Sequence, residues 1–185
     1  MTDLPAPVAT AFEAHDAFTQ RDERSYALET TVFETDVTAN PAEGPRDGAF
    51  TVVVTVPTLG AVTDDHVARV VEDGWFDTLE RRLEDTFSVA QTSTHESPVV
   101  ERDLEAGEVT VTLEYVAWNA REGVDDAKTV IEYVEGTYAQ GIIPGYDYRG
   151  PAATLLEGAL QAGQEAAGEA DGDADASSGG GGPQL

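Results

Sequence analysis

The segment Phe50–Val56 (FTVVVTV) constrains the fold of this chain more than any other. β-Branched and aromatic residues dominate it, and these residues favour the pleated, half-buried surface of a strand. Pro57 follows directly and ends the strand, because proline has no N–H to donate to a sheet ladder. The chain is therefore predicted to build a sheet around this segment.

Further extended segments lie on both sides of this strand. The threonine-rich segment Tyr26–Val37 alternates with a period of two, which predicts either one long strand or two short strands with a break near Thr31. The block Asn40–Gly48 (NPAEGPRDG) is rich in turn residues and separates this segment from the next strand. Val99–Asp103 and Glu108–Trp118 predict a hairpin, with its turn at Glu105-Ala106-Gly107.

Four other segments carry apolar residues at the three- and four-residue spacing of an amphipathic helix. They are residues 5–18, 63–83, 127–138 and 151–160. In the second segment, Thr63 is predicted as the N-cap, with Asp64 and Asp65 as acids of the first turn. In the fourth, Pro151 stands where the first helical residue is expected.

The element order α-ββ-α-ββ-α-α predicts an α+β domain. We expect an antiparallel sheet of four to five strands, packed by helices mainly on one face. In element order alone, residues 5–140 resemble the type III secretion chaperone-like fold, a resemblance that implies binding to other proteins. Residues 1–165 are predicted to form a single domain. Residues 166–185 are mostly Ala, Gly, Glu and Asp and end in SSGGGGPQL, which predicts a disordered tail.

The charge of the chain indicates its environment. It carries 36 acidic and 10 basic residues, a net charge of −26, and Lys128 is its one lysine. At about 1 M salt the Debye length falls to about 3 Å, which screens the self-repulsion that loosens such a protein in dilute buffer. Lysine depletion also removes apolar stems that concentrated salt drives toward association. We interpret the chain as a halophilic protein.

The same composition narrows the partners and the location. No basic stripe is present for nucleic acid, and the densest basic cluster, Arg81-Arg82, lies among Glu80, Glu84 and Asp85, with which ion pairs are expected. No basic n-region followed by an apolar run opens the chain, and no apolar stretch approaches the roughly 18 residues of a spanning helix. We therefore expect no nucleic acid, no membrane and a cytoplasmic location.

Catalytic patterns are absent from the sequence. There is no cysteine, no Gly-x-Ser-x-Gly motif and no phosphate-loop or dinucleotide fingerprint. His66 has close acidic neighbours in Asp64 and Asp65, but a helix-start role for these acids is favoured over metal binding. We expect no catalytic residue, no metal and no cofactor.

The segment 141–150 (GIIPGYDYRG) is the main candidate site. Tyr146, Asp147, Tyr148 and Arg149 follow each other within a loop that glycine and proline make compact. Aromatic and arginine side chains on a rigid backbone are typical of an interface anchor or the rim of a small-ligand site. In the alternative interpretation, which we favour, both tyrosines cap the core and Arg149 pairs with an acid to hold the last helix.

Trp75 and Phe76 form a second candidate. Two adjacent rings cannot both face one apolar stripe of a helix, so one of them is expected to lie toward solvent as a partner surface.

The stretches WFDTLERRLED and YVEGTY, and the GIIPGYDYRGP segment that follows, look like those of an uncharacterised family of small haloarchaeal proteins, a domain of unknown function. The similarity spans essentially residues 1–160 and implies a halophilic cytosol but no activity. We expect a non-enzymatic protein-interaction module, of the adaptor or chaperone-like kind, that binds another protein or a second copy of itself. The alternative is a small-ligand-binding or enzymatic domain that uses the 141–150 loop.

Overall fold

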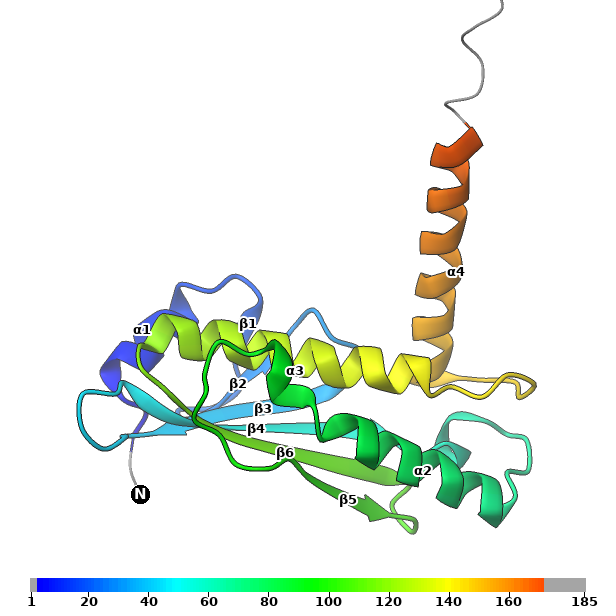
Figure 1. The fold of residues 1–185 in the computed structure, drawn as a ribbon, viewed down its shortest axis with the longest axis horizontal. Coiled ribbons are helices and arrows are strands. Elements are labelled where there is room, and N and C mark those ends of the chain that lie inside the picture. The colour runs from blue at the N-terminus through cyan, green and yellow to red at the C-terminus, as the bar shows by residue number, and fades with distance from the viewer. Residues whose placement is uncertain (1–2, 172–185) are drawn as a thin grey trace, which may run out of the picture.

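The computed structural model describes residues 3–171, which form an α+β fold of six strands and four α-helices (Figure 1). The strands are β1 (Phe18–Gln20), β2 (Tyr26–Leu28), β3 (Glu34–Asn40), β4 (Gly48–Pro57), β5 (Val99–Asp103) and β6 (Glu108–Ala117). The helices are α1 (Ala6–Glu13), α2 (Arg69–Leu83), α3 (Ala120–Gln140) and α4 (Gly150–Asp171), with short 3-10 turns at Gly60–Val62 and Thr86–Val89.

All strands belong to one antiparallel sheet with the order β1-β2-β3-β4-β6-β5. The sheet has six strands, so the prediction of four to five is wrong, and the element order begins with one helix and four strands. β1 was missed because it has only three residues. Tyr26–Val37 forms two strands, and the break between them is held by Glu135 of α3, whose carboxylate accepts hydrogen bonds from Thr31 Oγ1 (2.5 Å) and Val32 N (3.2 Å).

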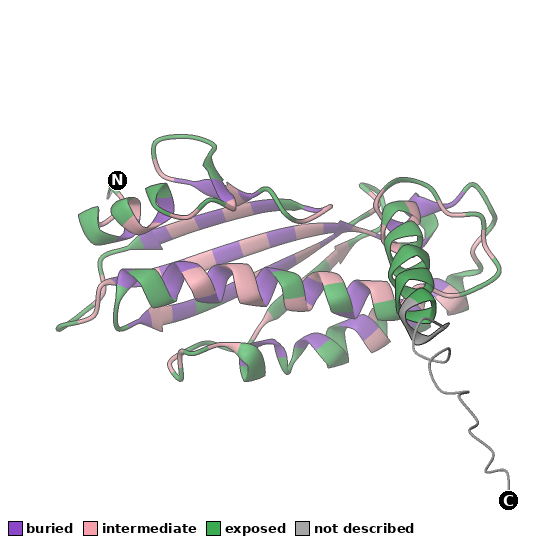
Figure 2. Cartoon of the chain, turned by 90° about the horizontal axis from the view of Figure 1, so that it is seen from above, coloured by how far each residue is buried: buried purple, intermediate pink, exposed green. Residues whose placement is uncertain are grey.

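One face of the sheet carries the core. In β4 and β6 every second side chain is buried, because a period of two places alternate residues on opposite faces. α1, α2 and α3 lie on this face (Figure 2), as predicted from the sequence.

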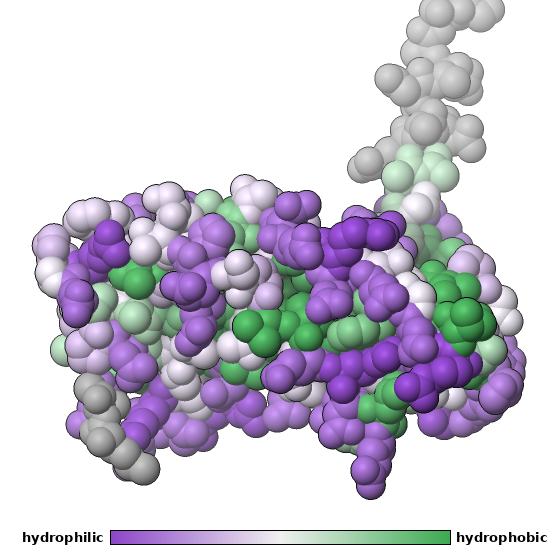
Figure 3. Space-filling model, turned by 60° about the horizontal axis from the view of Figure 1, so that its bottom comes forward, coloured by the Kyte–Doolittle hydropathy of each residue, from purple (hydrophilic) through white to green (hydrophobic). Residues whose placement is uncertain are grey.

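The other face is open and mostly polar. Its threonines and acids are in register across the central strands: Thr55 pairs with Thr110, and Thr51 with Glu114. Val53, Val116 and the exposed Val99 lie among them, and Figure 3 shows apolar residues near the centre of this side with polar residues around them. An open face of this kind gives no large apolar surface for a partner.

α3 lies close to the sheet at its N-terminal end. A Cβ at Gly123 would overlap the ring of Phe50 and stand 2.8 Å from Ala117 Cβ, so this position requires glycine. Phe50 stacks on Tyr115 with ring centroids 5.2 Å apart, and the Tyr115 hydroxyl donates to Gly123 O at 2.5 Å. Burial raises the pKa of Tyr115 well above its ordinary value.

The start of α2 differs from the prediction. The helix begins at Arg69 with Ala68 as N-cap, and Thr63 instead forms an isolated bridge with Tyr148. Thr63 is therefore not the N-cap. Asp64 and Asp65 are not acids of the first turn of α2 either, because they bind the 141–150 loop, which lies far along the chain.

α4 starts as predicted, with Pro151 in its first turn, but it stands away from the rest of the fold (Figure 1). Ala152 is buried, and every residue from 156 to 168 is exposed. The helix continues to Asp171 and thus includes residues 166–171, which the sequence assigned to the tail. The remainder of the predicted disordered tail, 172–185, lies outside the described residues.

Candidate functional site

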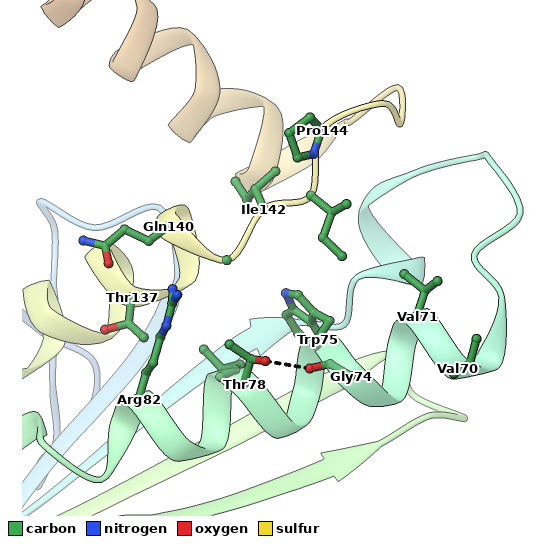
Figure 4. Close-up of a pocket in the computed structure, with 13 residues that line it drawn as sticks. Val70, Val71, Gly74, Trp75, Thr78, Arg82, Thr137, Gln140, Ile142 and Pro144 are labelled. Carbon is green, nitrogen blue, oxygen red and sulfur yellow. Dashed lines mark hydrogen bonds between the residues drawn. The ribbon is translucent and has the colours of Figure 1, made fainter.

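A pocket of about 420 Å³ lies between α2, the C-terminal end of α3 and the segment 141–144 (Figure 4). Six apolar side chains line most of it: Val70, Val71 and Leu79 of α2, and Ile142, Ile143 and Pro144 of the loop. This size and character fall in the range of small-molecule sites, which are mostly apolar with a few placed polar groups.

Trp75 forms the floor of the pocket. Its side chain packs against Tyr138 with ring centroids 5.9 Å apart, and the residue is only 5% exposed. Its indole Nε1–H faces the segment that contains Ile142 and makes no hydrogen bond to any residue within 3–171 (Figure 4). A Cβ at Gly141 would stand 3.7 Å from Nε1, so glycine leaves the space in front of this donor free.

Arg82 stands at one end of the pocket. In the described part of the chain its guanidinium has no carboxylate within 4.0 Å, whereas Arg102 pairs with Asp73 at 2.8 Å. The expected ion pairs of Arg81 and Arg82 with Glu80, Glu84 and Asp85 are not among those the described residues form. Figure 4 shows Arg82 rising beside Gln140, on the same side of α2 as the indole nitrogen of Trp75.

The pocket contains no acidic residue. None of the 13 residues that line it is Asp or Glu, although 36 of the 185 residues in the chain are. The hydroxyls of Thr78 and Thr137 donate to Gly74 O and Tyr133 O within their own helices. The pocket therefore combines an apolar wall with unpaired donors and offers no group suited to acid–base catalysis.

The predicted residues of the 141–150 loop contact the segment 62–65. Asp147 N donates to Asp65 Oδ2 at 2.7 Å, Arg149 N donates to Val62 O at 2.8 Å, and the Arg149 side chain pairs with Asp64. These contacts hold the loop to residues 62–65.

Both tyrosines of the loop pack beside this connection. Tyr146 and Tyr148 meet edge to face with centroids 6.2 Å apart, and the Tyr148 hydroxyl donates to Ile143 O. Burial raises the pKa of Tyr148. None of Tyr146, Asp147, Tyr148 and Arg149 lines the pocket.

The structure distinguishes Trp75 from Phe76. Trp75 is buried, and Phe76 is half-buried beneath Arg102, whose Cζ lies 4.5 Å from the ring centroid. The exposed tryptophan is Trp118, which is 58% exposed and lies under Arg46 at 5.1 Å. Sequence reasoning missed Trp118, and it missed Arg82 as a pocket residue, although Trp75 and Arg82 lie seven residues apart and so share one helix face.

A larger hollow of about 680 Å³ lies between α1 and the start of α3, but it is a weaker candidate. Asp16 and Asp125 line it, and His15 is already engaged, accepting from Ala17 N and lying 3.5 Å from Asp125.

A family model for a family of unknown function (DUF5813) matches residues 13–158. The chain belongs to this family. The match confirms the resemblance to a domain of unknown function and includes α2, α3 and the whole 141–150 loop, so the pocket lies within the family domain. No curated protein and no solved structure matches the chain significantly. Within residues 3–171, no helix has the length and apolar content needed to cross a bilayer.

Proposed function

We propose that this protein is a non-enzymatic protein-interaction module of a halophilic cytosol, and that it pairs with a second copy of itself through α4. The observation that carries the proposal is the exposure of this helix. Leu156 is 37% exposed and Leu160 is 68% exposed, on a helix whose contacts with the domain are confined to its start.

The residue pattern of α4 favours an identical partner. Leu156, Leu160, Gly163 and Ala167 follow at spacings of four, three and four, which places them in one stripe. Glu165 lies nine residues after Leu156 and hence about half a turn away from this stripe. Two copies that pair along the stripe bury leucine against small residues and keep Glu165 on the outer side of each helix.

A partner also stabilises the helix. Gly158, Gly163 and Gly168 each cost roughly 1 kcal/mol relative to alanine in a helix interior. An isolated helix with this composition is marginal in water, because most helical stability in proteins comes from packing. A second α4 supplies that packing.

The rest of the molecule directs the proposal to α4. The open face of the sheet is mostly polar and gives no large apolar surface for a partner, and the residues that line the pocket include no Asp, Glu or His. The alternative function, a small-ligand-binding domain that uses the 141–150 loop, is favoured by a separate observation: the first half of that loop lines the pocket beside Trp75.

Light scattering after gel filtration in multi-molar KCl tests the proposal. We expect the wild type to have twice the 19.6 kDa mass of one chain, and Leu156→Gln/Leu160→Gln to have the mass of one chain. Glu165→Gln, on the same helix but on the side opposite the stripe, is the matched control and should remain a dimer. A wild type that is monomeric at all concentrations, with no crosslinked partner, would contradict self-association; a heterologous crosslink through α4 would replace the second copy by another protein.

A further inference from the structure

We propose that the pocket between α2 and the segment 141–144 binds an amphipathic carboxylate, a small molecule with one anionic end and an apolar body. This site is separate from the α4 stripe and does not depend on self-association.

The pocket is polarised along its length (Figure 4). Val70, Val71 and Pro144 lie toward one end, and Arg82, Thr137 and Gln140 lie toward the other. Trp75 lies between them, with its ring forming the floor and its nitrogen facing upward. A ligand that fills this space has an apolar part against the valines and the loop, and a polar part near Arg82.

The polar end selects acceptors. The indole N–H of Trp75 is a donor only, it opens on the pocket, and it has no hydrogen-bond partner among residues 3–171, so it is available to an acceptor atom of a ligand. Arg82 likewise donates only, and its guanidinium is unpaired among the described residues. A carboxylate placed between these two groups satisfies both of them, with charge-assisted hydrogen bonds from Arg82.

The pocket lining contains one cationic side chain, Arg82, and no carboxylate, so it favours an anionic ligand over a cationic one. Carboxylates are frequent everywhere else in this chain, yet none reaches the 13 lining residues. The net charge of −26 does not prevent an anion from binding in brine, because at about 1 M salt charges beyond about 3 Å are largely screened. Asp85 lies in the adjacent hollow that Arg82, Thr137 and Gln140 also line, but among the described residues no carboxylate lies within 4.0 Å of the Arg82 guanidinium, which is therefore available to an anion in the pocket.

The indole N–H resonance of Trp75 provides a direct readout. The chain has two tryptophans, so Trp118→Phe assigns the signals in a ¹H–¹⁵N spectrum. Titration of this folded variant with octanoate in multi-molar KCl is expected to move the Trp75 signal saturably. Octan-1-ol should bind at least roughly tenfold more weakly than octanoate, because it has no charge to pair with Arg82. Octylammonium should not displace octanoate.

Two arginine variants test the polar end. Arg82→Gln is expected to reduce octanoate affinity roughly tenfold and to leave octan-1-ol affinity unchanged. Arg81→Gln is the matched control, since Arg81 is exposed on the same turn but does not line the pocket, and it should bind octanoate like the wild type.

Two results would overturn the proposal. One is a Trp75 signal that does not move with octanoate while the spectrum shows a folded protein. The other is equal binding of octanoate and octan-1-ol with no effect of Arg82→Gln, which would make the pocket an apolar slot for a partner side chain. Neither result changes the mass measured by light scattering, so self-association through α4 is judged separately.

Discussion

Helix α3 places a glycine beside an aromatic ring at each of its ends, and the two contacts differ. At the N-terminal end, Gly123 admits the ring of Phe50 so closely that no Cβ fits, and the Tyr115 hydroxyl is hydrogen-bonded to the helix. At the C-terminal end, Gly141 leaves ordinary contact distance to Trp75, whose indole N–H is without a partner in residues 3–171. The first contact is closed and serves the fold, and the second leaves room for a ligand.

Lowering the salt concentration has the largest expected effect on stability, and it should weaken the structure equally at both ends of α3. The repulsion among the carboxylates is spread over the whole body, so removing the screening weakens the fold as a unit. We expect the protein to lose its cooperative thermal transition below about 0.5 M salt, measured by circular dichroism over a KCl series. An unchanged melt in low-salt buffer would refute the halophilic interpretation.

Gly123→Ala should have the largest effect among single substitutions. The added methyl overlaps the Phe50 ring and Ala117, and overpacking of this kind costs about 1–3 kcal/mol. For a chain of this size, each kcal/mol lowers Tm by about 2–4 °C. Thermal melts in multi-molar KCl check this. An unaltered Tm would show that there is room for a methyl group between Gly123 and Phe50.

Substitution of Tyr115 and Tyr138, which lie near the N-terminal and C-terminal ends of α3, should have smaller effects on stability. Tyr115→Phe removes the hydrogen bond to Gly123 O and should cost about 1 kcal/mol, measured by denaturant unfolding. Tyr138→Phe, next to Trp75, should cost less, because the Tyr138 hydroxyl makes no hydrogen bond to a described residue. Equal costs would remove this distinction between the ends.

High pH extends the tyrosine comparison. Burial raises the pKa of both Tyr115 and Tyr138 above the ordinary value of 10.0, so the folded state favours their neutral forms. The stabilisation is complete below pH 10 and is lost as the pH rises through the folded-state pKa. We expect stability to fall above pH 10 and to fall less steeply in Tyr138→Phe, as unfolding curves over a pH series would show. A parallel fall in both proteins would contradict this.

Gly141→Ala has the smallest expected effect on stability. The φ of Gly141 is −86°, which alanine adopts without strain, and its Cβ would find only ordinary contacts. We expect stability to rise by about 0.4–1 kcal/mol, because alanine lowers the entropy of the unfolded chain. The same methyl covers the Trp75 N–H, so octanoate binding should weaken. A loss of stability comparable to that of Gly123→Ala would mean that both ends are closed.

The sequence predicted what depends on local pattern. The long strands β4 and β6, the hairpin turn before Glu108 and the body of α3 follow from periods of two and 3.6 residues and from glycine. The start of α2 could not be predicted this way, because Tyr148, far along the chain, pairs with Thr63. The break near Thr31 was one of two alternatives that the sequence left open, and Glu135 of α3, which holds Thr31, decides between them.

The candidate site was harder to predict than the fold. Tyr148 and Arg149 were predicted from their chemistry, and in the structure Tyr148 hydrogen-bonds within the loop and Arg149 pairs with Asp64. Arg82 and the segment 141–144 have ordinary chemistry, and they form a site only because α2 and the end of α3 meet around a pocket whose lining includes no acid.

Intermolecular NOEs between octanoate and the two indole N–H groups test the pocket most directly. We predict NOEs from octanoate to the Trp75 N–H and to the methyls of Ile142, with none to Trp118, which lies away from the pocket. NOEs to Trp118 alone, or to neither indole in a folded and octanoate-saturated sample, would contradict binding in the pocket between α2 and the segment 141–144.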